Sequence, residues 1–243
     1  MSDIPKQIIV ETDDSGKEYA RVNPEYKEYV KKEKYYLRLK RSKIPEAYWN
    51  IDFEHYLGDR EELAYKQILY YAQHCYEQDF NNVHLYIYGI HSSQKTTLAC
   101  NILKESLKQG KEAKFILASD LIKKLMKVQG FGRDEEIERE IQELKQASII
   151  CIDDVFDPDK TLMWKNSENK NIIISAWDDF IRSVIVSKTK IIMTSNFDFS
   201  IINQYYGKSL LELVERNFYP IELRTNIKHV AKNKLSDAFK DIQ

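Results

Sequence analysis

Five short apolar runs, separated by segments with helical patterns, constrain the fold of this 243-residue chain more than any other feature. The runs are rich in β-branched and aromatic residues and cover residues 84–88, 113–118, 148–152, 190–194 and 219–223. Strand-like runs that alternate with helix-length segments predict βαβ units, whose parallel strands are joined by right-handed crossovers. We therefore expect an α/β domain built on a mostly parallel sheet of about five strands.

The chain before these runs has two parts of different composition. Residues 1–25 are polar and acid-leaning with a turn signal at residues 13–16, and we expect a loose arm or a small hairpin there. Residues 25–43 have the length of a helix, and Pro45 would end it because a proline excludes the preceding residue from helical geometry. This helix-length segment carries eight cations against three glutamates, together with four tyrosines.

These differences predict a division of the chain into two functional parts. Residues 1–44 would form an N-terminal extension that contacts a partner or DNA, and residues 45–243 the main domain. The main domain is expected to begin with a helix over residues 60–80.

Composition excludes several classes of protein. The formal net charge is -1, so any surface that attracts nucleic acid must be local. The cysteines Cys75, Cys100 and Cys151 are far apart and lack the spacing of a zinc site, which indicates reduced thiols. No window approaches the ~20 apolar residues of a membrane span, and no signal peptide is evident at the N-terminus. We expect a cytoplasmic protein of a bacterium or a phage-infected host, with no membrane partner.

The stretch "LYIYGIHSSQKTTLAC" at residues 85–100 has the layout of a phosphate-binding loop. In such a loop, backbone N–H groups and the start of a helix surround the phosphates, a lysine neutralises them, and a hydroxyl holds Mg²⁺. Gln94 stands where the pattern has its second glycine, so a chance match is the alternative. The residues expected to bind nucleotide are Gly89, Ser92, Ser93, Gln94, Lys95, Thr96 and Thr97.

Two later runs also end in polar side chains. "ASIICIDDVF" ends in Asp153 and Asp154, and carboxylates at the carboxyl end of a buried strand lie where α/β proteins bind ligands. We expect Asp153 to bind the metal together with Thr96, and Asp154 to orient or activate a water molecule. "KIIMTSNFD" ends in Thr194, Ser195 and Asn196, and Asn196 would contact the outer phosphate or the attacking water. The alternatives are a surface Asp-Asp turn and an ordinary asparagine turn.

In this order, and followed by "SLLELVERNFYPIEL", the motifs over residues 42–225 resemble the DnaC/IstB-like branch of AAA+ ATPases. That branch comprises bacterial helicase loaders, their phage-encoded relatives and transposition helper ATPases. The resemblance implies a three-layer P-loop NTPase sandwich without a helical lid. It also assigns Lys95 and Thr96 to Walker A, Asp153 and Asp154 to Walker B, and Asn196 to sensor 1.

The resemblance implies further that Arg216 is an arginine finger, which stabilises charge on the γ-phosphate of a neighbouring subunit. A surface arginine paired with Glu212 or Glu215 is the alternative. Arg182 and Arg224 are weaker finger candidates.

The chain departs from the pattern in three places. A positive φ at residue 94 would strain Gln94, which puts nucleotide affinity and turnover in doubt. About 20 residues follow the last run, too few for a lid, and lidless endings occur within this branch. Residues 157–171 are longer than a usual connection and would be either a partner- or DNA-facing insertion or a plain surface loop.

As a whole, the resemblance implies an ATP- and Mg²⁺-dependent loader, phage-like in type, that places a DnaB-like replicative helicase on single-stranded DNA and assembles into a nucleotide-bridged oligomer. The basic segment at residues 27–43 would contact helicase or single-stranded DNA, or it would be a solvated helix. The alternatives are an IstB-like transposition helper and a non-hydrolysing nucleotide-binding adaptor. A small-molecule kinase is disfavoured because no arginine-rich lid follows Asp154.

Overall fold

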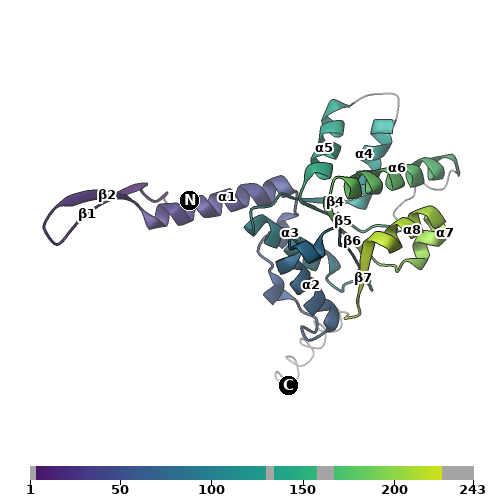
Figure 1. Cartoon of the computed structure of the whole chain (residues 1–243), viewed down its shortest axis with the longest axis horizontal. Coiled ribbons are helices and arrows are strands. Elements are labelled where there is room, and N and C mark those ends of the chain that lie inside the picture. The colour runs from purple at the N-terminus through teal and green to yellow at the C-terminus, as the bar shows by residue number, and fades with distance from the viewer. Residues whose placement is uncertain (1–3, 130–133, 158–166, 226–243) are drawn as a thin grey trace, which may run out of the picture. The chain divides into compact units, whose positions relative to one another are not determined.

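The computed structural model describes residues 4–129, 134–157 and 167–225, and these form two compact units (Figure 1). The units comprise Met1–Arg41 and Ser42–Gln243. The functional division expected at residue 44 stays a prediction. We describe each unit by itself.

The smaller unit is a hairpin followed by a helix. Strands β1 (Ile8–Thr12) and β2 (Glu18–Val22) pair antiparallel. The turn between them is held by Asp13, whose carboxylate accepts hydrogen bonds from the backbone N–H groups of Ser15 and Lys17 at 2.9 and 3.0 Å. Of the two conformations expected for residues 1–25, the structure therefore has the hairpin.

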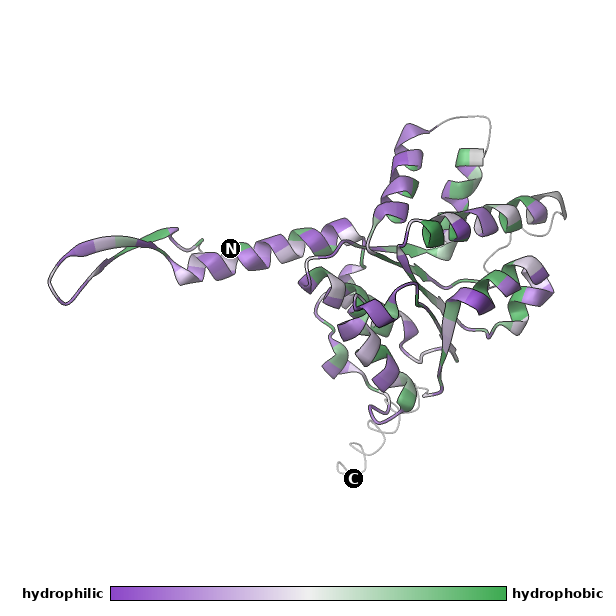
Figure 2. Cartoon of the chain, viewed as in Figure 1, coloured by the Kyte–Doolittle hydropathy of each residue, from purple (hydrophilic) through white to green (hydrophobic). Residues whose placement is uncertain are grey.

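Helix α1 (Pro24–Ser42) follows, and its polarity agrees with the sequence. The Asn23 side chain caps it by accepting from the Glu25 N–H at 2.9 Å. Figure 2 shows α1 coloured mainly as hydrophilic, and seven of its cations are exposed: Lys27, Lys31, Lys32, Lys34, Arg38, Lys40 and Arg41. The helix ends ahead of Pro45, and Lys43 takes a left-handed conformation with φ 58°.

The larger unit is built on a five-stranded sheet. Its strands are β3 (His84–Gly89), β4 (Ala113–Leu117), β5 (Ile149–Asp153), β6 (Lys190–Ser195) and β7 (Phe218–Leu223). They lie in the order β4-β5-β6-β3-β7, and every pairing is parallel. The α/β fold with a mostly parallel five-stranded sheet is therefore confirmed.

Helices cover both faces of this sheet, which makes three layers (Figure 1). Every residue of β5 and β6 is buried, as expected for central parallel strands. One face packs on α2 (Leu63–His74) and α3 (Lys95–Lys108). The other lies against an apolar cluster formed with α4 (Ala118–Gln129), α5 (Glu135–Gln146), α6 (Ser167–Val186), α7 (Ser200–Tyr206) and α8 (Lys208–Asn217).

Two sequence expectations differ from the structure or fall outside it. The helix expected over residues 60–80 is wrong in extent, because α2 ends at His74 and a separate 3-10 turn, η3 (Gln78–Phe80), follows. There the Phe80 ring packs on Tyr70 and Tyr71 at 5.8 and 5.9 Å, a tertiary contact that a continued helix would not allow. The expectations about a helical lid and about the long connection lie mostly outside the described residues.

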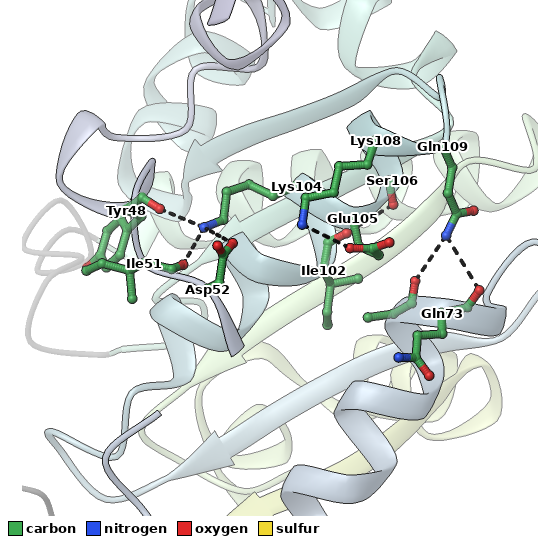
Figure 3. Close-up of polar contacts among 11 residues, drawn as sticks. Tyr48, Ile51, Asp52, Gln73, Ile102, Lys104, Glu105, Ser106, Lys108 and Gln109 are labelled. Atoms are coloured by element: carbon green, nitrogen blue, oxygen red, sulfur yellow. Dashed lines mark hydrogen bonds and ion pairs between the residues drawn. The ribbon is translucent and has the colours of Figure 1, made fainter. Parts of the chain in front are cut away.

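Residues 44–58 precede α2, and we call them the lead-in segment. A buried lysine of α3 forms hydrogen bonds with this segment. The segment contains the 3-10 turns η1 (Glu46–Tyr48) and η2 (Phe53–His55). Lys104 of α3 is 1% exposed, and its Nζ donates to the carbonyl oxygens of Tyr48 and Ile51 and to the Asp52 carboxylate (Figure 3). Burial lowers the pKa of Lys104, while Asp52 opposes this shift. The lead-in segment is thus held against α3 by a cation that has three acceptors.

The pH dependence of stability should reveal a buried histidine in β3. His84 is 2% exposed, and its Nδ1 accepts from the Ile191 N–H at 3.0 Å, so the ring is neutral. Burial, with Lys190 nearby, lowers its pKa to about 4. Because the unfolded chain binds this proton first, at about pH 6.5, stability is full above that pH and is lost as pH falls toward 4.

We expect a loss of about 3 kcal/mol between pH 7 and pH 4 from this group, measured by urea denaturation. The variant His84→Gln should show a flatter dependence on pH over this range. His91→Gln, at an exposed histidine, serves as the control and should keep the wild-type slope. An unchanged slope in His84→Gln would contradict the assignment.

Candidate functional site

The loop between β3 and α3 begins at a glycine that the fold requires. Gly89 has φ 144°, and a Cβ atom at this position would lie 2.1 Å from the carbonyl oxygen of Leu223, in the neighbouring strand β7. A side chain would therefore push β7 away from β3. The first glycine of the loop pattern is needed for the sheet as well as for the loop.

The loop backbone presents donors for which the described part of the chain has no acceptor. Ser92 and Gln94 have left-handed conformations with φ 64° and 62°, and the loop runs directly into the first turn of α3. Within the three described ranges, the backbone N–H groups of Ser92, Ser93 and Gln94 donate to no protein acceptor. Backbone donors of this kind at a helix N-terminus form a concave anion-binding site.

Lys95 lies inside this loop and is 7% exposed. Its Nζ donates to the carbonyl oxygens of Gly89 and Ile90 at 2.9 and 2.8 Å, and to Ser93 Oγ at 3.3 Å. The ammonium group is therefore already in position among the loop atoms. Binding of a phosphate would exchange some of these acceptors for phosphate oxygens.

Gln94 makes the turn that a glycine makes in the usual pattern, and its side chain has a partner. Its left-handed backbone costs roughly 1–2 kcal/mol compared with a residue without Cβ. Its Oε1 accepts a hydrogen bond from the Leu57 N–H at 2.8 Å, and such a bond contributes about 0.5–1.5 kcal/mol. The contact with the lead-in segment thus offsets much of the strain.

Asp153 is the point at which three elements meet. It ends β5, is 4% exposed, and its Oδ1 accepts from Thr96 Oγ1 at 2.9 Å and from Thr194 Oγ1 at 2.5 Å. Thr96 lies in the first turn of α3, and Thr194 lies in β6. The structure therefore brings the two residues expected to hold a metal into direct contact. Hydroxyl and carboxylate oxygens are the donors that Mg²⁺ prefers, so they fit this ion.

Asp154 follows in a left-handed conformation with φ 60° and is only partly buried. Its backbone N–H donates to Thr194 Oγ1 at 3.0 Å. A cavity of about 160 Å³ beyond the carboxyl ends of β4 and β5 is lined by Asp153, Asp154 and Asp157, together with Ser119 and Tyr206. Asp154 thus faces a space large enough for water, which suits its expected role; the role itself stays a prediction.

Asn196 and Thr97 complete the set of expected residues near the loop. The β3–β6 register pairs Tyr88 with Ser195, so Asn196 comes next, at the level of Gly89. Its side chain is partly buried and makes no hydrogen bond to the described residues. Thr97 is buried at 8% exposure, so Thr96 is the more accessible of the two hydroxyls.

Arg216 lies apart from the loop, on the exposed surface of α8. In the described part of the chain it forms no ion pair, and Glu212, one of the partners considered for it, pairs with Lys208 at 3.5 Å instead. The weaker candidates are both paired: Arg182 with Asp178 at 2.6 Å and Arg224 with Glu222 at 2.7 Å. Arg216 is thus the finger candidate whose guanidinium pairs with no carboxylate of the described residues.

Sequence patterns gave no sign of the contribution of the lead-in segment to this site. Burial raises the pKa of Tyr48, and Cys100, Asp153 and Asp154 raise it further, so Tyr48 lies within electrostatic reach of the carboxylates. The contacts of Lys104 and Gln94 with this segment link positions 37 to 56 residues apart in the chain. No periodicity or spacing in the sequence predicts these pairs.

Other chemistries have no support in the described residues. Cys75, Cys100 and Cys151 are buried free thiols. Across residues 4–129, 134–157 and 167–225, no group of three or more His, Cys, Asp or Glu side chains could hold a metal ion by itself. None of the helices in these ranges is sufficiently long and apolar to span a bilayer.

Comparison with known families agrees with this geometry. The model of the family described as IstB-like ATP binding protein matches residues 26–213, which is most of the chain. A search of curated proteins found no significant match.

Solved structures that are similar to this chain include DnaI, the DnaC helicase loader and the replication initiator DnaA. DnaI is 15% identical with a TM-score of 0.58, and the match covers 74% of this chain and 95% of that one. The DnaC helicase loader is 16% identical with a TM-score of 0.52, covering 73% and 99%. The initiator DnaA bound to AMPPCP and single-stranded DNA is 16% identical with a TM-score of 0.59, and the match covers 80% of this chain but 56% of DnaA. At these identities the similarity shows the AAA+ fold.

The double role of Thr194 can be tested with a matched pair of variants. Thr194→Val removes the donor to Asp153 and the acceptor for the Asp154 N–H. Because both groups are within the expected Walker B motif, we expect ATP turnover to fall by about tenfold or more while ATP affinity changes little.

Thr189→Val is the control, since Thr189 is equally buried near the opposite end of β6 and donates to the carbonyls of Lys145 and Ala147. Both variants should lose about 1–2 kcal/mol of stability in urea denaturation. Equal turnover in the two variants would show that Thr194 is structural only.

Proposed function

Because the chain belongs to the family of IstB-like ATP-binding proteins, we propose that it hydrolyses Mg²⁺-ATP and uses this cycle to place a replicative helicase on single-stranded DNA. The observation that carries the nucleotide site is the pair of hydrogen bonds to Asp153 beside a buried loop lysine. These contacts bring the Asp153 carboxylate to the Thr96 hydroxyl, and Thr96 directly follows the lysine, as in a phosphate-binding loop.

We assign each step of hydrolysis to residues of this chain. The loop N–H groups and Lys95 bind the β- and γ-phosphates, and Thr96 and Asp153 hold Mg²⁺, which supplies positive charge to the phosphate oxygens when bound. Asp154 orients a water molecule and accepts its proton as the water oxygen bonds to the γ-phosphorus. The bond between this phosphorus and the β–γ bridging oxygen breaks, which yields ADP and phosphate. Asn196 contacts the γ-phosphate or the water.

Arg216 would complete the site of a second copy of the chain. Its side chain is exposed and carries no ion pair among the described residues, so it is available to a neighbour. A guanidinium that reaches the γ-phosphate stabilises charge as it develops during phosphoryl transfer. This assignment predicts assembly into a nucleotide-bridged oligomer.

The loading role is supported by the similar structures and by the chemistry of α1. Two of the similar structures are DnaI and the DnaC helicase loader. Four tyrosines lie among the exposed cations of α1, and Tyr36 is 46% exposed, so the helix offers charge for phosphates and rings for bases. We therefore propose α1 as the contact for helicase or single-stranded DNA.

A second candidate is an IstB-like transposition helper, and the matching family is described as IstB-like. The two functions differ in their protein partner. A pull-down from host extract would retain a hexameric helicase in the first case and a transposase in the second. A third candidate, a non-hydrolysing adaptor, would show no turnover even with helicase and single-stranded DNA present.

The nucleotide site itself is tested by Lys95→Ala. This change removes the cation that contacts the phosphates, and we expect it to abolish the rise in melting temperature that Mg²⁺-ATP gives the wild type. Lys108→Ala, an exposed lysine on the same helix, is the control and should keep that rise. If Lys95→Ala gains as much thermal stability from ATP as the wild type, the site is wrongly assigned.

The role of α1 in DNA binding is tested through its salt dependence. Replacing Lys31, Lys32 and Lys34 by alanine should weaken binding to an oligo-dT strand and lower the slope of log K against log salt by about 2, since each lost phosphate contact contributes about 0.7. The control replaces three exposed lysines elsewhere, Lys66, Lys108 and Lys208, with the same change in net charge. Equal slopes for both triple variants would indicate that α1 does not contact DNA.

A further inference from the structure

Gln94 is the position at which this chain departs from the phosphate-binding pattern. The oxygen of its side-chain amide has a hydrogen-bond partner, whereas the nitrogen does not have one among the described residues. Oε1 accepts from the Leu57 N–H at 2.8 Å. Nε2 carries two donors, and these meet no protein acceptor among residues 4–129, 134–157 and 167–225. One side chain thus joins the loop to the lead-in segment and keeps two donors free for an anion.

Leu57 belongs to a segment that is held firmly elsewhere. Lys104 binds its middle part through two carbonyls and the Asp52 carboxylate (Figure 3). Next to Leu57, the Tyr56 ring stacks on Tyr65 at 4.9 Å with an interplanar angle of 13°. Leu57 therefore follows directly on a part of the chain that α3 and α2 hold in place. The same segment carries Tyr48, which lies within electrostatic reach of Asp153 and Asp154.

A glycine at position 94 would adopt the left-handed turn without strain, but it could not reach Leu57. The glutamine thus makes a contact with the lead-in segment that an unstrained glycine could not make. We propose that Gln94 is a positioning residue that couples phosphate in the loop to the lead-in segment, with Oε1 on the Leu57 amide and Nε2 donating to a phosphate oxygen. The proposal rests on the proposed function in that the loop holds the phosphates of ATP.

The coupling must act in both directions. If nucleotide binding tightens the contact between Gln94 and Leu57, then loss of that contact weakens nucleotide binding by the same factor. The lead-in segment would thereby differ between the free and the nucleotide-bound protein. Leu57 is 47% exposed, so such a change is accessible to a partner of the chain.

Two variants separate the two halves of the amide. Gln94→Asn keeps the backbone, because asparagine tolerates left-handed geometry, but it is one methylene too short to reach Leu57. Gln94→Glu keeps the length and the acceptor but offers no donor to a phosphate. The readout is amide hydrogen exchange of Leu57 in the full chain, followed by NMR. The Tyr56 N–H, which donates to the Phe53 carbonyl at 3.1 Å, is an internal control in the same segment.

In the free protein we expect slow exchange at Leu57 in the wild type and in Gln94→Glu, and about tenfold faster exchange in Gln94→Asn. Exchange at Tyr56 should stay the same in all three. On addition of Mg²⁺-ATP, Leu57 should slow further in the wild type and in neither variant. ATP affinity should fall in Gln94→Asn by the factor that ATP contributes to Leu57 protection.

Equal exchange of Leu57 in the wild type and in Gln94→Asn would overturn the contact. Equal slowing by ATP in the wild type and in Gln94→Glu would overturn the coupling. Failure of the proposed function gives a different result: the wild type would then show no thermal stabilisation by ATP. In that case the proposed coupling to phosphate is overturned as well. The exchange rate of the Leu57 amide in the free protein still shows whether the contact with Gln94 exists.

Discussion

A single carboxylate oxygen of Asp153 holds the candidate site together. It accepts hydrogen bonds from Thr96 at the start of α3 and from Thr194 in β6, while Asp153 itself ends β5. A buried carboxylate without donors would be costly, so the two hydroxyls and the carboxylate stabilise one another's positions. Parallel strands deliver their carboxyl ends to the same edge of a sheet, and this is why three distant segments meet there.

A second constraint comes from outside the usual motifs. Lys104 is buried among two carbonyls and the Asp52 carboxylate, and it holds the lead-in segment on α3. From there Leu57 reaches Gln94 in the loop. The candidate phosphate-binding loop is therefore supported from two sides, by the sheet through Gly89 and by the lead-in segment through Gln94.

The remaining features of interest are exposed. Arg216 on α8 and the cations of α1 have their charges in solvent, and the hairpin exposes Ile8, Val10 and Val22. An isolated two-stranded hairpin is marginal in water, so an apolar surface there is consistent with a partner. Lys95 and Asp153 of the proposed nucleotide site are thus buried, whereas Arg216 and the cations of α1, which we propose as contacts for other molecules, are exposed.

The strands were predictable from sequence, and each observed end lies within one residue of the expected one. Uncharged, β-branched runs can be buried on both faces of a sheet and in few other places, which explains this accuracy. The helix over residues 60–80 was predicted too long because periodicity does not report the packing of Phe80 on Tyr70 and Tyr71. Local pattern therefore determined which segments are strands, and tertiary packing determined where one helix stops.

The same distinction holds for the site. The sequence by itself determined its chemical groups, because the types and order of Lys95, Thr96, Asp153 and Asn196 are a local property of strand ends and loops. Only the tertiary structure decided that Thr194 shares the Asp153 oxygen, that Lys104 anchors the lead-in segment and that Gln94 meets the Leu57 amide. These contacts join residues far apart in the chain, and their existence depends on distances that only the packed sheet and helices set.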